Sequence, residues 1–166
     1  MAYDEVFRAL SGRRARYLVA GGVAVNLLGV PRMTADLDLL VDLAPANARR
    51  VVEALRGIGF VPRVPVEFAG FADTRLRESW VREKNMLVFS VLRPERPWEV
   101  VDLFVDPPIP FADAWKRRRR IRLGGLVIPV VSMRDLIAMK RRAGREQDLS
   151  DIEALRKLER LDNGLS

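Results

Sequence analysis

Apolar residues recur along this chain at two spacings, one typical of helices and the other of strands. The helical spacing predicts helices at residues 3–13, 23–28, 46–56, 132–142 and from about 148 to 161. Alternation and short apolar runs predict strands at residues 17–20, 37–41, 86–92, 98–105, 120–123 and 126–131. The leucines of residues 37–41 would also suit a helix. Residues 60–84 show little periodicity, so we expect a short strand near Phe60 followed by irregular structure.

This order of elements predicts an α+β fold in which helices flank a mixed β-sheet. A chain of 166 residues is long enough to bury about 70% of its unfolded surface in one domain. We therefore expect a single domain over residues 1–166, with a core at about 14–131 and a helical tail at about 132–162. The tail is predicted to be a helical hairpin, because Gly144 separates its two helical segments.

The segment from Gly21 to Asp38 combines a glycine corner with two closely spaced carboxylates. Gly21 and Gly22 follow an apolar strand and precede a short helix, and such a corner lets a phosphate approach the backbone. Asp36 and Asp38 are separated by one residue, so in a strand both side chains point to one face, about 6.6 Å apart. Buried carboxylates at that separation repel each other, and a divalent cation removes the repulsion. The alternative is a solvated Asx-turn, although Asp38 lies inside the apolar run Leu-Asp-Leu-Leu-Val.

Asp102 is a third carboxylate within an apolar strand, in the sequence Trp98-Glu-Val-Val-Asp-Leu-Phe-Val105. Strand alternation places Glu99 on the opposite face, and Asp106 lies at the strand end. A charge on an apolar face needs a partner, which is either an arginine or the cation expected at the first two carboxylates. Three carboxylates that converge on one point would suit two Mg²⁺ ions about 3.5–4 Å apart, the arrangement for in-line phosphoryl transfer.

The composition restricts the available chemistry. The chain has no cysteine and no histidine, which excludes disulfides, thiolate metal sites, cysteine nucleophiles and Ser–His triads. Any metal would be held by oxygen, which favours Mg²⁺ or Mn²⁺. A net charge of +7 is compatible with polyanionic partners, and equally with a basic surface that binds nothing. No apolar run approaches the ~20 residues of a membrane span, so we expect a cytoplasmic protein without membrane contact.

Two stretches resemble a known family. The residues Val19-Ala-Gly-Gly-Val-Ala24 and Arg32-Met-Thr-Ala-Asp-Leu-Asp38 resemble the nucleotidyltransferase superfamily related to DNA polymerase β. Within it, the pattern Gly-Gly…Arg-x-Thr-x-Asp-x-Asp is similar to the AbiEii-like toxin and minimal nucleotidyltransferase branch. The tail is similar to the same branch through Asp135, Lys140, Gly144, Arg145, Asp148 and Asp151. The resemblance spans residues 17–42, 98–105 and 132–155, about half of the chain.

The resemblance implies a metal-dependent enzyme that moves a nucleoside monophosphate from an NTP to a hydroxyl group. Asp36, Asp38 and Asp102 would bind the metal ions, with Asp102 also a candidate base for the acceptor hydroxyl. Toxin relatives imply tRNA or another RNA as acceptor, whereas other members of the superfamily modify proteins or small molecules. A toxin would also imply an antitoxin. The chain departs from many AbiEii-like toxins in lacking their long C-terminal helical region, so a helical partner protein could supply the acceptor site.

The same resemblance implies a group of phosphate-binding residues. Gly21 and Gly22 would hold the triphosphate, Lys140 would reach it from the tail, and Arg32 and Thr34 would line the entrance. Two of these have a structural alternative. Arg32 could pair with a strand acid, and Lys140 with an acidic residue of the following helix.

Lys116 to Arg120 form the densest basic run, directly after Trp115. A nucleic acid could bind this run and stack a base on the indole. An exposed turn before a charged edge strand explains the same residues, and we favour it slightly. Two rival functions stay open for the whole chain. The first is a non-catalytic nucleotide- or RNA-binding module, which the three intact acids argue against. The second is a small DNA-binding domain, for which no helix–turn–helix spacing is evident.

Overall fold

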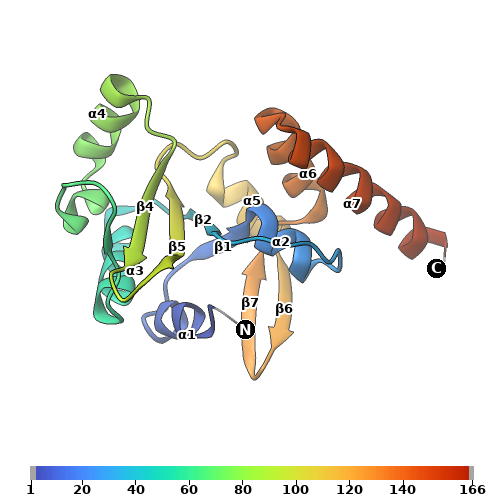
Figure 1. Ribbon diagram of the computed structural model, residues 1–166, viewed down its shortest axis with the longest axis horizontal. Coiled ribbons are helices and arrows are strands. Elements are labelled where there is room, and N and C mark those ends of the chain that lie inside the picture. Colours follow the sequence, from blue (N-terminus) through green and yellow to red (C-terminus); the bar gives the residue numbers. More distant parts are fainter. Residues whose placement is uncertain (1–2, 165–166) are drawn as a thin grey trace.

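The computed structural model describes residues 3–164, and a mixed seven-stranded sheet forms its centre (Figure 1). The strands lie side by side in the order β3-β4-β5-β2-β1-β7-β6. Their bounds are β1 Tyr17–Ala20, β2 Leu37–Val41, β3 Val61–Pro62, β4 Val88–Arg93, β5 Arg96–Phe104, β6 Arg119–Leu123 and β7 Leu126–Val130. The central strand β2 runs parallel to β5 and antiparallel to β1. The predicted α+β class with a mixed sheet is therefore confirmed, and residues 37–41 are a strand.

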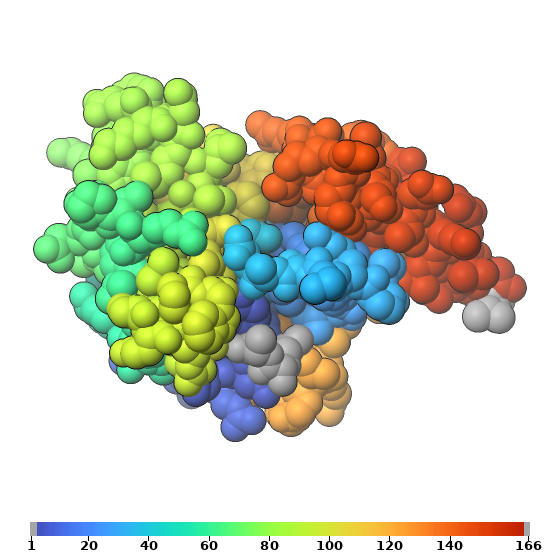
Figure 2. All heavy atoms as spheres, viewed as in Figure 1, coloured from blue at the N-terminus to red at the C-terminus, as the bar shows by residue number. Residues whose placement is uncertain are grey.

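Helices cover the sheet and extend beyond it. Their bounds are α1 Asp4–Gly12, α2 Gly21–Leu27, α3 Pro45–Gly57, α4 Thr74–Lys84, α5 Phe111–Arg117, α6 Met133–Ala143 and α7 Glu146–Gly164, with a 3₁₀ turn η1 at Phe68–Ala72. In Figure 1, α6 and α7 form a hairpin that projects from one side of the core, coloured orange to red. Figure 2 shows the same tail standing out from the rest of the surface. Within residues 3–164, no helix has both the length and the apolar character needed to cross a membrane.

The two faces of the sheet have different roles. On one face, the ring of Phe89 in β4 stacks on Trp80 of α4 and packs against Phe68 and Phe71 of η1. Because successive side chains of a strand point to opposite faces, the residue after Phe89 points to the other face. That residue is Ser90, which is paired in register with Asp102 of β5. The aromatic rings therefore lie against one face of β4, and Ser90 and Asp102 point to the reverse face.

The tail begins and ends largely where the sequence predicts. Ser132 caps α6 by accepting a hydrogen bond from the Asp135 amide at 3.1 Å, and Gly144 ends it with a φ of +66°. The second helix starts at Glu146, two residues before the predicted start at about 148. Asp148 does not act as an exposed cap at the helix end. Its buried carboxylate lies in the first turn of α7 and accepts hydrogen bonds from the backbone and side chain of Arg145.

Two helices were not predicted. Residues 74–84, expected to be irregular, form α4, which Asp73 caps by accepting from the Leu76 amide at 3.1 Å. The buried residues of this helix are one tryptophan, Trp80, and one arginine, Arg77. The guanidinium of Arg77 donates to the carbonyls of Phe71 and Leu43, so the position that faces inward looks polar in the sequence. The other unpredicted helix is α5, whose seven residues are too few for a clear period.

Candidate functional site

One cleft contains every residue that the sequence nominated for metal or phosphate binding. It has a volume of about 420 Å³ and lies between the β2–β5 pair, the start of α2, the segment before β2 and the tail. Its lining residues are Gly21, Gly22, Arg32, Met33, Thr34, Ala35, Asp36, Asp38, Asp102, Lys140, Arg145, Gln147 and Asp148. Segments more than 100 residues apart in the sequence therefore meet at this cleft.

The three strand carboxylates lie on the same face of the sheet. Asp38 of β2 is directly opposite Asp102 of β5 in the parallel register, so the pleat points both side chains the same way. Asp36 precedes the strand by one residue and lines the same cleft. Asp102 therefore lines the cleft and does not point to the aromatic face.

Burial and mutual repulsion disfavour the charged forms of these carboxylates. Burial, followed by repulsion from Asp102 and Asp36, raises the pKa of Asp38 to about 7. Burial and then Asp102 also raise the pKa of Asp36. Within residues 3–164, neither Asp36 nor Asp38 accepts a hydrogen bond or forms an ion pair. Basic groups act on these two acids only beyond ion-pair distance: Arg63 lowers the pKa of Asp36, and Lys140 and Arg145 lower that of Asp38, without cancelling the upward shifts.

These donors fit a hard divalent cation in chemical type. All three are carboxylates, no nitrogen or sulfur ligand competes, and a cation would cancel the repulsion that raises the pKa of Asp38. They are not drawn together in advance, since no group of three acidic side chains in residues 3–164 is close enough to hold an ion as it stands. A bound ion would therefore pull the carboxylates towards one another.

Two glycines allow other groups to approach the start of α2. Gly21 has a φ of +61°, and a Cβ there would lie 1.9 Å from Asp38 Oδ2. A Cβ on Gly22 would lie 2.5 Å from both Arg32 Nη1 and Thr34 Oγ1. The glycine pair is therefore required because a carboxylate, a guanidinium and a hydroxyl occupy the space that side chains would fill.

A buried network of charges joins the tail to this corner. Asp151 of α7 accepts a hydrogen bond from Arg32 Nη1 at 3.1 Å and forms an ion pair with Lys140 Nζ at 2.8 Å. Asp148 contacts Lys140 Nζ at 3.3 Å and Arg145 Nε at 2.7 Å. Burial raises the pKa of Asp148, but hydrogen bonds from Arg145 and Lys140 outweigh burial and lower it overall. Both acids are almost fully buried, with exposures of 1% and 3%.

This network decides between the alternatives for the two cations. Lys140 lines the cleft and also forms ion pairs with Asp148 and Asp151 of α7. The structural alternative for Lys140, a pair with an acid of the following helix, is therefore present. Arg32 pairs with Asp151 of the tail and not with a strand acid, which corrects that alternative. In the part of the chain that the structure describes, Asp36, Asp38 and Asp102 consequently form no ion pair with a basic side chain. Lys140 and then Arg145 still lie near enough to lower the pKa of Asp38 against its burial.

Several residues of the site were not nominated by the sequence. Arg145 and Gln147 line the cleft from the start of α7, and Gln147 Nε2 donates to Asp151 Oδ1 at 3.0 Å. Ser90 Oγ donates to Asp102 Oδ1 across the β4–β5 pair. The predicted hairpin contained Ser90, but its pairing with Asp102 depends on a register that the sequence pattern does not specify.

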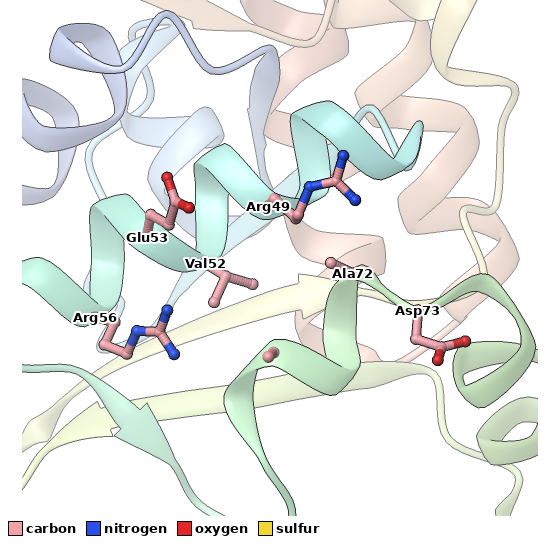
Figure 3. A pocket seen from close by; sticks show the side chains of 7 residues that line it. Arg49, Val52, Glu53, Arg56, Ala72 and Asp73 are labelled. Atoms are coloured by element: carbon pink, nitrogen blue, oxygen red, sulfur yellow. The ribbon is translucent and has the colours of Figure 1, made fainter.

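Another groove lies on the opposite side of the sheet, between α3 and η1 (Figure 3). Its volume is about 320 Å³, and its lining residues are Arg49, Val52, Glu53, Arg56, Ala69, Ala72 and Asp73. Figure 3 shows the charged side chains spread along the two rims. Glu53 already pairs with Arg13 at 2.9 Å. This groove has no convergent set of acids or unpaired donors comparable with the first cleft.

No family model matches the sequence, and no curated protein sequence matches it. Solved structures resemble it in fold. ANT(2'')-Ia in complex with adenylyl-2''-tobramycin has a TM-score of 0.60 at 13% identity, covering 93% of this chain and 85% of that chain. The lincosamide antibiotic adenylyltransferase LnuA, lincomycin-bound, has a TM-score of 0.59 at 15% identity, covering 91% and 92%. A Thermotoga maritima protein assigned as a nucleotidyltransferase has a TM-score of 0.59 at 16% identity, covering 96% and 91%.

These comparisons show the fold, which is that of nucleotidyltransferases, as the sequence predicts. The likeness extends over more than nine tenths of this chain, including the tail. None of these structures points specifically to the AbiEii-like branch, so that part of the resemblance stays a prediction.

Proposed function

We propose that this protein transfers a nucleoside monophosphate from an NTP to a hydroxyl group. The observation that carries the proposal is the register of Asp38 against Asp102, which sets two carboxylates side by side with Asp36 next to them. The glycine corner next to Asp38 and the cations of the tail line the same cleft. A cleft that combines oxygen ligands with phosphate donors suits a metal–nucleoside triphosphate complex.

Asp36, Asp38 and Asp102 are the residues that would hold Mg²⁺ or Mn²⁺. When bound there, such an ion would neutralise charge on the transferring phosphate. Asp38 and Asp102 lie on the paired strands β2 and β5, which fix these two carboxylates relative to each other. Ser90 leaves Asp102 Oδ2 available by bonding Oδ1.

The triphosphate would lie against Gly22, Arg32 and Thr34. Within residues 3–164, the buried Nε of Arg32 has no hydrogen-bond partner, and a phosphate oxygen would supply one. Thr34 Oγ1 approaches the bare Cα of Gly22 from the same direction as the guanidinium. Lys140 and Arg145 add positive charge from the tail. These donors surround the corner where the polyphosphate needs support.

The reaction then requires little covalent work from the protein. The acceptor oxygen attacks the α-phosphorus, the bond from that phosphorus to the α–β bridging oxygen breaks, and pyrophosphate leaves. Asp102 accepts the hydroxyl proton. Catalysis comes from positioning and from neutralising the charge on the phosphates.

Labelled nucleotides test this proposal directly. Incubation with Mg²⁺ and α-³²P-labelled NTPs should transfer label to an acceptor, whereas γ-³²P should be released as pyrophosphate. EDTA should abolish transfer, and excess Mg²⁺ or Mn²⁺ should restore it. Transfer of the γ label would contradict the proposal. Tight NTP binding by calorimetry without any transfer to RNA, protein or small hydroxyl compounds would instead favour the non-catalytic binding module.

We propose RNA as the acceptor on the strength of one surface. The guanidinium of Arg118 lies 3.9 Å from the centroid of the Trp115 ring, and that of Arg16 lies 4.8 Å from it. Arg118 directly precedes the edge strand β6, and Arg120 and Arg122 lie within it two residues apart, a spacing of about 6.6–6.8 Å along a strand. Burial, then Arg120 and Arg16, lower the pKa of Arg118, which reflects poorly neutralised positive charge. In the described chain, Arg118, Arg120 and Arg122 form no ion pair.

Removal of this basic row should weaken RNA binding. We expect R118A/R120A/R122A to reduce affinity for a single-stranded RNA about 10²-fold at low salt, and to lower the salt slope by about 2. Fluorescence anisotropy against salt concentration measures both quantities. R49A/R56A/R75A removes the same charge from other exposed positions and should have a much smaller effect. Equal losses in the two variants would show that net charge alone attracts RNA.

Small-molecule hydroxyl groups are the second candidate acceptors. They are suggested by the antibiotic ligands of ANT(2'')-Ia and LnuA, which share this fold. The α-label assay separates RNA from small-molecule acceptors. A labelled RNA is retained by a size-exclusion filter and releases its label on nuclease treatment.

A further inference from the structure

The phenol of Tyr3 connects the two segments that carry the strand carboxylates. Tyr3 caps the start of α1, and its ring is 7% exposed. Its hydroxyl donates to the carbonyl of Ala35, the residue immediately before Asp36. The carbonyl of Val100, two residues before Asp102, lies 3.3 Å from the same hydroxyl. One side chain thus contacts both approaches to the carboxylates.

The position of Asp36 depends on such a contact more than that of its two partners. Asp38 and Asp102 lie within paired strands, whereas Asp36 ends a stretch, residues 30–36, that has no regular structure. The start of this stretch is held where the Arg32 amide donates to Asn26 Oδ1 at 2.9 Å. Its middle is open, since Met33 is 95% exposed. Tyr3 supplies a side-chain hydrogen bond at its end.

The hydroxyl is suited to act as a permanent donor. Burial, followed by the charges of Asp36, Glu99 and Asp38, raises the pKa of Tyr3 to about 12. The phenol is therefore protonated at all physiological pH values. It can give its single proton to one carbonyl at a time, and both acceptors lie on segments that lead into the cleft.

We propose that Tyr3 is a positioning residue that holds Asp36 beside Asp38 and Asp102. The inference rests on the proposed metal-dependent transfer for its functional consequence, but its structural consequence is independent of it. Tyr3 does not itself line the cleft, and it acts through the backbone carbonyl of Ala35, a lining residue next to Asp36.

The test compares Tyr3→Phe with Tyr17→Phe. Both variants lose one hydroxyl from a buried ring, but Tyr17 stacks on Phe7 under α1 and contacts neither segment. Hydrogen exchange followed by mass spectrometry should show residues 30–37 exchanging about 3- to 10-fold faster in Tyr3→Phe, the effect of one ordinary hydrogen bond. Tyr17→Phe should leave this peptide unchanged.

Metal binding and kinetics supply the functional readout. We expect Tyr3→Phe to weaken Mn²⁺ binding, measured by calorimetry with a non-hydrolysable NTP, by a similar factor. The kcat of nucleotidyl transfer should fall while the KM for NTP stays within twofold, because the phosphate-binding side is untouched. Uniformly faster exchange across the sheet, or a matching loss in Tyr17→Phe, would reduce Tyr3 to a packing residue.

The two proposals fail in different ways. Wild-type exchange and Mn²⁺ affinity in Tyr3→Phe would overturn the positioning role and leave nucleotidyl transfer standing. If the wild-type protein binds no Mn²⁺ and transfers no label, the proposed function is overturned. The positioning of Asp36 is then still decided by the exchange of residues 30–37.

Discussion

Replacing Asp38 by asparagine is expected to reduce nucleotidyl transfer by about 10³-fold or more while the protein stays folded. Asp38 is the central carboxylate of the three, paired with Asp102 and within the repulsive field of both others. An amide of the same shape keeps the packing but removes the charge that would hold a divalent cation. Transfer of α-³²P from NTP, in single-turnover conditions, measures the loss.

The same substitution should stabilise the protein in the absence of metal. The pKa of Asp38 is about 7 in the folded protein and near 3.8 when unfolded, so the folded state binds more protons between these values. Stability of the wild type therefore falls as pH rises from about 4 to 7, and the deficit persists above pH 7. Asp38→Asn should raise the free energy of unfolding above pH 7 by on the order of 2 kcal/mol, which is less than the full pKa shift of Asp38 would give. Urea denaturation at pH 4.5 and pH 8, in EDTA, checks the sign.

Asp106→Asn is the matched control for both measurements. Asp106 is an exposed acid at the end of β5, close in sequence to Asp102 but outside the cleft. Its replacement should leave transfer and the pH dependence of stability unchanged. Full activity of Asp38→Asn would exclude the carboxylate mechanism. A loss of stability at pH 8 would show that Asp38 is satisfied in the folded protein by a contact other than a metal ion.

The sequence was most informative where one physical constraint dominates. Apolar runs identified the central strands, and the isolated acids within them identified the carboxylates, because a charge inside an apolar strand needs a specific reason. The role of Gly21 and Gly22 was also predictable, since a glycine pair between a strand and a helix indicates that another group approaches the backbone closely. The structure shows what approaches, namely Asp38 at the first and Arg32 at the second.

The sequence was least informative where the fold uses polar groups as interior contacts. Arg77 faces inward in α4 and satisfies two carbonyls, so the helical period of residues 74–84 is hidden. Asp148 looks like an exposed helix cap but is a buried ion-pair partner. The contacts of Tyr3 join residues 32 and 97 positions apart. Such contacts depend on tertiary geometry, which has no local signature.

Replacing Asp151 by alanine is expected to give the largest loss of stability of any variant considered. Asp151 is 3% exposed and forms ion pairs with both Arg32 and Lys140, so its removal takes one partner from each of two cations. Removing one member of a buried ion pair costs about 3–5 kcal/mol, because the remaining charge keeps its desolvation penalty. For a chain of this size, thermal unfolding should shift down by roughly 6–12 °C or more.

Kinetics should separate this variant from Asp38→Asn. Loss of Asp151 releases Arg32 and Lys140, which lie on the proposed phosphate side of the cleft, so the KM for NTP should rise about 10-fold or more. The three strand carboxylates are untouched, so kcat should change less than KM. Steady-state labelling across NTP concentrations, at a temperature where the variant is fully folded, measures the separate effects on KM and kcat.

Two further variants identify the cause of the Asp151→Ala effect. Glu153→Ala removes an exposed acid from the same helix and should cost less than about 0.5 kcal/mol. Lys140→Met combined with Asp151→Leu replaces charges with apolar groups of similar size and should recover much of the lost stability, because no buried lysine is then left unpaired. That double variant should still bind NTP weakly. If it instead regains the wild-type KM, the network serves only to attach the tail, and the triphosphate is held without Lys140.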